Sequence, residues 1–187
     1  VEMIYIEDKN FINENEIKLI NKVLYSESTP WFLQPYAEDK NKFNPLFTHS
    51  IIRRPEARDE GEVFNSNPEH RGIFMHLLTK FCKNNNYKLD EMLRCAINFT
   101  FDNNTEKCGV HQDHDRPYHQ LLIYLNEAEK NAKTIVLDDD EKTVLKEIKP
   151  EAYKGVLFDG KPHYHYFPKK GFRIVVVYTF TGKLCTN

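Results

Sequence analysis

Hydrophobic positions follow a helical spacing in parts of the first half of the chain. After a short alternating run at residues 3–8, which predicts a strand, apolar residues in 14–25 recur every three or four positions. That spacing is typical of an amphipathic helix, and Asn13 directly ahead of it is a favourable N-cap. A second helix is predicted through residues 70–84, because an Asn-Pro pair places Pro68 at its first position.

The second half of the chain has short apolar runs separated by turn residues, with no helical spacing between them. Strands that follow one another at regular intervals indicate a sandwich or barrel. We therefore predict one α+β, mainly β domain over residues 1–187, with helical support and loops in 1–94 and a β core in 95–187. The expected strands are 46–54, 93–101, 119–127, 133–139, 143–148, 153–160 and 172–180.

Composition narrows the class of protein. The chain has 187 residues, 40% of them hydrophobic and 29% charged, with a formal net charge of −2. This balance is ordinary for a globular domain and does not favour nucleic-acid binding. The four cysteines form no CxxC pair, which argues against a cysteine zinc site and for a reducing compartment. The first residues are acidic rather than a signal peptide, and no run is long enough to span a membrane, so we expect a cytoplasmic protein with no membrane partner.

A candidate metal site begins with the histidine-rich stretch CGVHQDHDRPYH. His111 and Asp113 are two residues apart, so in an extended segment both side chains point to the same side. A later strand ends in two more histidines, His163 and His165. Two histidines and one carboxylate form the facial triad of non-haem Fe(II) sites, whereas a closed zinc site needs four protein ligands.

Arg173 is a second unusual position, because it leads into the continuously apolar final strand. A buried guanidinium is costly unless it meets an anion, and it can hold a carboxylate with two hydrogen bonds. The partner is either a carboxylate ligand or an acidic residue of the chain such as Asp159 or Glu151.

Taken together, His-x-Asp, a distal histidine and an arginine about ten residues later resemble the 2-oxoglutarate- and Fe(II)-dependent dioxygenases. The chain is most similar to their small prolyl-hydroxylase-like members of phage and bacterial type. HQLLIYLNE resembles the strand and turn after His-x-Asp in that family, and GVLFDG the strand before the distal histidine. The resemblance implies a double-stranded β-helix, a jelly-roll or cupin-like barrel, with flanking N-terminal helices.

The resemblance also implies roles for individual residues. His111, Asp113 and one of His163 or His165 would bind Fe(II), and Arg173 would bind the far carboxylate of the cosubstrate 2-oxoglutarate, leaving a position for dioxygen. The usual spacing from the preceding strand falls on Tyr164, so a shift of one residue is needed. His163 keeps the ten-residue distance to the arginine and is preferred, with His165 as the alternative.

Three positions depart from or qualify the family pattern. Relatives often have a tyrosine about ten residues before His-x-Asp, where this chain has Phe101, so Tyr124 becomes a candidate contact for the cosubstrate. The Ser or Thr often found two residues after the arginine is Val175, which predicts altered cosubstrate binding. The intact Asp113 argues against the halogenating subclass.

Residues outside the motif have less specific expectations. His114 and His119 are expected to be solvated loop residues, with a substrate-facing role as the alternative. His49, His70 and His76 are expected to have no special role. Trp31 and Phe32 are expected to pack, or else to form a lid over the site together with the loop 55–67.

The resemblance implies that the chain is an Fe(II)- and 2-oxoglutarate-dependent dioxygenase that hydroxylates an unactivated C–H bond. The expected substrate is a prolyl or other protein or peptide residue, or a small molecule. Two alternatives remain: a non-catalytic cupin-like binding protein, and a zinc-dependent hydrolase or isomerase on the same barrel. Oligomeric state is not predicted.

Overall fold

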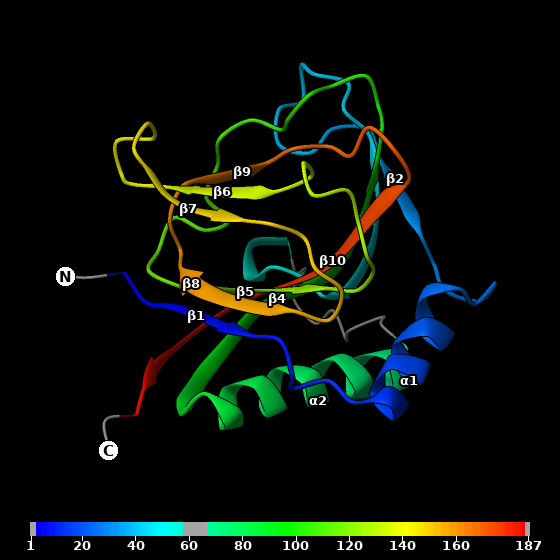
Figure 1. Cartoon of the computed structure of the whole chain (residues 1–187), viewed down its shortest axis with the longest axis vertical. Helices are drawn as coiled ribbons and strands as arrows, with labels where there is room; N and C mark the ends of the chain where they lie inside the picture. The colour runs from blue at the N-terminus through cyan, green and yellow to red at the C-terminus, as the bar shows by residue number, and fades with distance from the viewer. Residues whose placement is uncertain (1–2, 58–66, 186–187) are drawn as a thin grey trace.

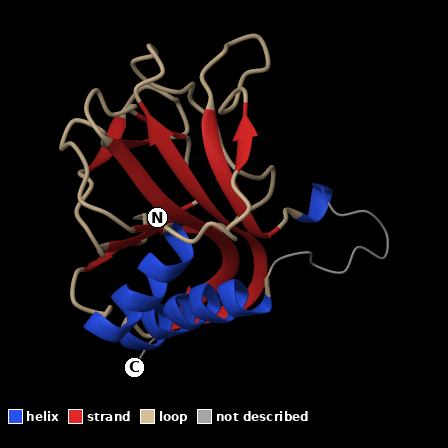
Figure 2. Ribbon diagram, turned by 90° about the vertical axis from the view of Figure 1, so that its right-hand side faces the viewer, coloured by secondary structure: helices blue, strands red, loops and turns tan. Residues whose placement is uncertain are grey.

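The computed structural model of the chain describes residues 3–57 and 67–185. A seven-stranded and a three-stranded antiparallel sheet lie one above the other, and two helices pack on the outer side of the larger sheet (Figures 1 and 2). The elements are β1 (Tyr5–Asp8), α1 (Glu14–Leu24), β2 (Phe32–Gln34), β3 (Leu46–Ile52), a 3₁₀ turn (Pro55–Ala57), α2 (Pro68–Asn84), β4 (Tyr87–Phe101), β5 (His119–Tyr124), β6 (Thr134–Leu137), β7 (Val144–Ile148), β8 (Gly155–Asp159), β9 (His163–His165) and β10 (Phe172–Leu184).

Both predicted helices are present and begin at the predicted caps. The Asn13 side chain accepts a hydrogen bond from the backbone N–H of Glu16 at 3.0 Å, and the Glu16 carboxylate accepts from the backbone N–H of Asn13 at 2.7 Å. This reciprocal pair is a capping box, which satisfies N–H groups that have no partner within the helix. Asn67 caps α2 by accepting from the backbone N–H of Glu69 at 2.8 Å, with Pro68 in the first turn.

The larger sheet has the order β1-β8-β5-β10-β4-β3-β2, and the smaller sheet has the order β7-β6-β9. The final strand β10 is central and pairs with both β4 and β5. Every strand expected from the sequence is present, and β2 and β9 are additional short strands. Because β1, β2 and β3 join the larger sheet, segments from the first half of the chain contribute directly to the barrel.

The main core lies between the larger sheet and the helices, which explains why β10 is apolar along most of its length. The fully buried side chains of α2 that face this sheet are Phe74, Leu77, Leu78 and Phe81. A second cluster, which includes Leu122, Tyr124, Val136 and Val175, belongs to strands of both sheets. The two clusters pack against both faces of β10 and β5, so these strands form a well-packed wall of the space between the sheets.

Gly155 marks a tight point in the core. A Cβ atom there would lie 2.7 Å from the Phe81 ring and 2.9 Å from the Phe11 ring. Gly155→Ala is therefore expected to destabilise the protein by about 1–3 kcal/mol, through overpacking. The matched control is Gly72→Ala on α2, where nothing lies within 4 Å of the new Cβ and a gain of about 0.5–1 kcal/mol is expected. Urea unfolding of both variants measures the difference, and equal stabilities would contradict the packing.

A buried histidine pair joins β3 to α2. His49 Nε2 lies 3.0 Å from His70 Nδ1, and the other ring nitrogen of His49 lies 3.2 Å from the carbonyl oxygen of Pro30. A carbonyl only accepts, so His49 Nδ1 carries the proton and His49 Nε2 accepts from His70. Burial lowers the pKa of both histidines below the ordinary value.

Acid is therefore expected to destabilise the metal-free protein. Histidines held neutral by folding bind fewer protons than the unfolded chain, so their stabilising effect is complete above the unfolded pKa and is lost as the pH falls below it. Each such group can lower the free energy of unfolding by at most about 1.4 kcal/mol per pH unit. Urea unfolding between about pH 7.5 and about pH 5.5 measures this slope. The His70→Gln variant should show a smaller slope, and an unchanged slope would contradict the assignment.

Within the described ranges, no helix combines the length and the apolar character that crossing a membrane requires.

Candidate metal centre and cosubstrate pocket

A cavity of about 400 Å³ opens between the two sheets. Its wall combines apolar side chains of the barrel with an unusual number of polar and charged groups. The lining residues are Gln34, Ala37, Glu38, Leu46, Arg54, Arg94, Asn98, His111, Gln112, Asp113, Gln120, Leu122, Thr134, His163, His165, Arg173, Val175 and Val177.

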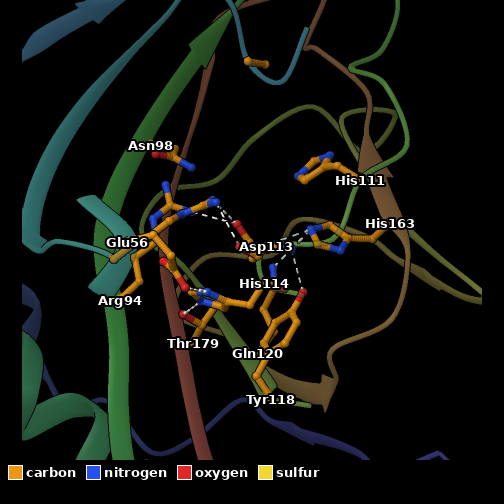
Figure 3. A network of polar contacts seen from close by, with 12 residues as sticks. Glu56, Arg94, Asn98, His111, Asp113, His114, Tyr118, Gln120, His163 and Thr179 are labelled. Atoms are coloured by element: carbon orange, nitrogen blue, oxygen red, sulfur yellow. Dashed lines mark hydrogen bonds and ion pairs between the residues drawn. The ribbon is translucent and has the colours of Figure 1, made fainter. Parts of the chain in front are cut away.

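Three of these residues form a cluster suited to one metal ion. His111 and His163 face each other through two backbone hydrogen bonds, both of 3.0 Å, and their ring centroids are 4.6 Å apart. Asp113 Oδ2 lies 3.7 Å from His163 Nε2. One ligand atom from each of the three residues lies within 4.8 Å of the others (Figure 3). The structure thus brings together the His-x-Asp motif and one histidine of the distal pair.

Hydrogen bonds to the outer ring nitrogens orient both histidines. His111 Nδ1 lies 3.0 Å from the carbonyl oxygen of Gly109, and His163 Nδ1 lies 2.9 Å from the carbonyl oxygen of Lys161. Because carbonyl oxygens only accept, both Nδ1 atoms carry the proton and both Nε2 atoms present a lone pair. Burial lowers the pKa of His163 to about 4, so this ring is neutral and available to a metal at neutral pH.

The Asp113 carboxylate is oriented by groups on the side away from the two histidines. Its Oδ1 accepts from Arg94 Nη1 at 2.9 Å and from Arg54, and its backbone N–H donates to the Tyr118 hydroxyl at 2.8 Å. Burial acts to raise the pKa of the carboxyl, but Arg94 and Arg54 outweigh it and hold the pKa well below its usual range. Asp113 is therefore a carboxylate with Oδ2 directed toward the histidines.

His165 lies in the same cavity but outside the cluster. Its Nδ1 lies 3.2 Å from the sulfur of Cys108, and its Nε2 is buried without a hydrogen-bond partner among the described residues. The metal-binding geometry in this part of the chain includes His163 and not His165. The structure therefore favours His163 over His165 as the third ligand.

Arg173 lies elsewhere in the cavity wall, at the start of β10. It is only 4% exposed, its Nη2 donates to Thr134 Oγ1 at 2.9 Å, and its guanidinium lies 5.4 Å from the ring centroid of Tyr124. The Tyr124 hydroxyl lies 3.3 Å from Thr134 Oγ1. Tyr124 thus positions Arg173 and Thr134, and its hydroxyl does not line the cavity.

No carboxylate of the described residues pairs with Arg173. Asp159 lies 3.8 Å from His119, and Glu151 pairs with Lys9 at 2.9 Å. The two acidic residues that the sequence offered as partners of Arg173 therefore contact other residues. A buried guanidinium facing a cavity without a counter-ion is a ready site for an external carboxylate.

His114 in the loop and His119 at the start of β5 make structural contacts and are not free solvated side chains, which corrects the expectation from the sequence. His114 is 6% exposed, and its Nε2 lies 2.7 Å from Thr179 Oγ1 (Figure 3). His119 contacts the hydroxyl of Tyr87. Neither residue lines the cavity. His114 packs between the loop and β10, and His119 lies on β5 against Tyr87 of β4.

The lid expected over the site is only partly described. Trp31 packs edge-to-face against His49 and Phe99, with ring centroids 6.2 Å and 6.0 Å away. Phe32 is 61% exposed on the edge strand β2. Residues 55–57 form a 3₁₀ turn, and residues 58–66 lie outside the described part of the chain.

Several cavity residues were not predicted from the sequence. Arg54, Arg94 and Gln120 all contact the metal cluster: the two arginines bind Asp113, and Gln120 Nε2 lies 3.3 Å from His163 Nε2. Arg94 carries a signal that was available, since it interrupts a strand whose neighbours are buried and apolar. Arg54 and Gln120 carry no comparable signal.

The site fits a divalent ion and an anionic chelator. Two imidazole nitrogens and one carboxylate oxygen converge from one side, and ligands bound at about 2 Å to one ion lie about 3–4 Å apart, as Asp113 Oδ2 and His163 Nε2 do. Three protein ligands leave other coordination positions to exogenous groups. The buried Arg173 supplies a positive charge in the same cavity.

Comparison with known proteins supports this description at the level of the fold. No protein-family model matches the chain, and no curated protein matches its sequence. Among solved structures, an oxidoreductase of the 2OG-Fe(II) oxygenase family from Burkholderia pseudomallei has a TM-score of 0.73 at 15% identity, covering 96% of this chain and 84% of the other.

Prolyl hydroxylases also match, two of which are described here. One, from Trichoplax adhaerens in complex with a peptide fragment of the hypoxia inducible factor oxygen degradation domain, has a TM-score of 0.59 at 15% identity over 94% of this chain and 83% of the other. The other is the viral collagen prolyl hydroxylase of Paramecium Bursaria Chlorella virus-1 as its 2OG complex, with a TM-score of 0.56 at 15% identity over 94% of both chains. The two facing sheets of this chain thus form a double-stranded β-helix, the fold that the family resemblance implied.

Proposed function

We propose that the chain is an Fe(II)- and 2-oxoglutarate-dependent dioxygenase that hydroxylates a C–H bond of its substrate. The observation that carries the proposal is the joint presence, in one cavity, of a His-Asp-His cluster and a buried arginine that pairs with no carboxylate of residues 3–57 and 67–185. A metal-binding protein without redox chemistry needs the cluster but not the arginine. The double-stranded β-helix supports the same conclusion.

The residues would divide the work as follows. His111, Asp113 and His163 would hold Fe(II), and Arg173 would bind the far carboxylate of 2-oxoglutarate. Iron and 2-oxoglutarate together supply the oxidising chemistry: dioxygen is consumed, 2-oxoglutarate becomes succinate and CO₂, and one oxygen atom enters the substrate. The chain itself keeps the His163 imidazole neutral, holds the Asp113 carboxylate ionised and encloses the site between two sheets.

For the substrate we propose a protein or peptide residue, with a prolyl residue as the first candidate. Two of the similar structures are prolyl hydroxylases, one of them bound to a peptide fragment. The cavity offers polar groups suited to peptide amides, including Gln34 on β2 and Asn98 on β4. Gln34 Nε2 already donates to the backbone carbonyls of Tyr36 and Ala37, so its Oε1 can accept from a peptide N–H, and the Asn98 amide can donate to a peptide carbonyl.

The test combines cosubstrate turnover with product mass. Protein loaded with Fe(II) is incubated with 2-oxoglutarate and a library of proline-containing peptides, with the same peptides carrying Pro→Ala as controls. We expect succinate to form and one oxygen atom to be added to proline peptides only. Succinate coupled to oxidation of another peptide or a small molecule would replace the prolyl assignment. Metal binding without succinate under any condition would indicate a binding protein, and hydrolysis supported by Zn(II) would indicate a hydrolase.

A further inference from the structure

A buried histidine that the metal cluster does not use lines the same cavity as Arg173. His165 Nε2 is shielded from solvent and has no hydrogen-bond partner among the described residues. Arg173 Nε is likewise shielded from solvent and has no hydrogen-bond partner among the described residues. Unpaired buried polar atoms are costly, and their presence in a cavity wall indicates a ligand that satisfies them.

The two groups are brought together by the pairing of β6 with β9. His165 is directly opposite Thr134 in this pair, and Thr134 Oγ1 accepts from Arg173 Nη2 at 2.9 Å. Residues directly opposite on antiparallel strands have Cβ atoms about 5 Å apart.

Cys108 determines which nitrogen of His165 carries the proton. Its sulfur already accepts from the backbone N–H of His165 at 3.2 Å, and it lies 3.2 Å from His165 Nδ1. Burial raises the pKa of this thiol to about 12, so the thiol keeps its proton. The S–H can then donate to Nδ1, which places the ring proton on Nε2, the nitrogen without a partner among the described residues.

The orientation of His165 is opposite to that of the metal-cluster histidines. His111 and His163 donate from Nδ1 to backbone carbonyls and present lone pairs at Nε2. His165 accepts at Nδ1 from a thiol and presents an N–H at Nε2. The first arrangement suits a cation, whereas the second suits an anion.

We propose that His165 is a second cosubstrate-binding residue, which donates a hydrogen bond from Nε2 to the far carboxylate of 2-oxoglutarate beside Arg173, and that Cys108 is the positioning residue that fixes its tautomer. The inference rests on the proposed function.

The test measures cosubstrate affinity without turnover. Anaerobic Fe(II)-loaded protein is titrated with 2-oxoglutarate, and the metal-to-ligand charge-transfer band gives the dissociation constant. His165→Leu is expected to weaken 2-oxoglutarate binding about 10- to 100-fold, the effect of losing a hydrogen bond to a charged group. His165→Gln, which keeps an N–H donor at similar reach, should stay within about threefold of the natural protein. Fe(II) affinity should not change in either variant.

Pyruvate provides a matched ligand control, because it has the 2-oxo acid but no far carboxylate. Pyruvate should bind more weakly than 2-oxoglutarate, and its dissociation constant should be the same for the natural protein and for His165→Leu. A loss of pyruvate binding as large as that of 2-oxoglutarate would place His165 near the metal and overturn the proposal, as would a loss of Fe(II) binding.

The tautomer has its own readout. In Zn(II)-loaded protein with ¹⁵N-labelled histidine, the ring resonances of His165 are identified as those that the His165→Gln variant lacks. They should be the resonances of a ring protonated at Nε2. In Cys108→Ala they should shift toward a mixture of the two tautomers. A ring protonated at Nδ1 in the natural protein would overturn the role of Cys108. If the natural protein forms no charge-transfer band at all, the proposed function fails. If the band forms and His165→Leu binds 2-oxoglutarate normally, only this inference fails.

Discussion

His163→Ala is expected to abolish the charge-transfer band that Fe(II) and 2-oxoglutarate form with the natural protein, and to abolish succinate production. The variant keeps only His111 and Asp113, and the Asp113 carboxylate already shares its charge with Arg94 and Arg54. Loss of residues that merely orient a ligand costs about 10- to 100-fold in metal affinity, so loss of a ligand should exceed about 100-fold. Anaerobic Fe(II) titration gives the affinity directly.

The comparison with His165→Ala makes this test specific. That variant should keep Fe(II) affinity and still form the band, at higher 2-oxoglutarate concentration. His119→Gln serves as the control for a histidine outside the cavity and should behave as the natural protein. If His165→Ala loses the metal and His163→Ala keeps it, the ligand assignment is reversed.

The second large effect concerns Arg173. Arg173→Met keeps most of the side-chain volume but removes the guanidinium charge. The other arginines in the described cavity wall, Arg54 and Arg94, are both bound to Asp113, so no other buried charge is available to the far carboxylate there. Removing one partner of a buried charge pair costs about 2–5 kcal/mol, which corresponds to an increase of about 30- to several-thousand-fold in the dissociation constant. Titration of the Fe(II)-loaded variant with 2-oxoglutarate measures it.

Two controls separate charge from stability. Arg173→Lys should recover part of the affinity, because it restores the charge without the paired hydrogen bonds. Arg116→Met, at an exposed ion pair with Glu91, should leave cosubstrate binding unchanged. Normal 2-oxoglutarate binding by Arg173→Met would remove the main support for the oxygenase proposal.

The elements of this fold could be predicted from the sequence because their signals are local. The caps at Asn13 and Asn67 and the apolar runs of β5, β8 and β10 depend on neighbours a few residues away. Arg173 could be identified because a charge beside a buried strand requires a partner. The same argument applies to Arg94 in the run LRCAINFTF, so its contact with Asp113 was predictable in principle.

What could not be predicted depends on contacts between distant segments. The choice between His163 and His165 follows from which one pairs with His111 and which one meets Cys108. The burial of His114 follows from its contact with Thr179, far along the chain. Spacing within one segment contains no information about such pairings, which explains why the histidines of the loop were expected to be solvated.

The pairing of His111 with His163 also affects how the protein folds. The segments that carry Asp113 and His163 are separated by fifty residues in the sequence. Backbone hydrogen bonds join them between His111 and His163 and between Cys108 and His165, while β9 itself has three residues. A metal ion at this point would form a reversible cross-link between the long loop and the smaller sheet. Since the unfolded chain holds no such cluster, an ion at about 100 times its dissociation constant would add about 2.7 kcal/mol to the free energy of unfolding. The same three side chains that would bind iron for catalysis would therefore make the closed barrel sensitive to the iron supply.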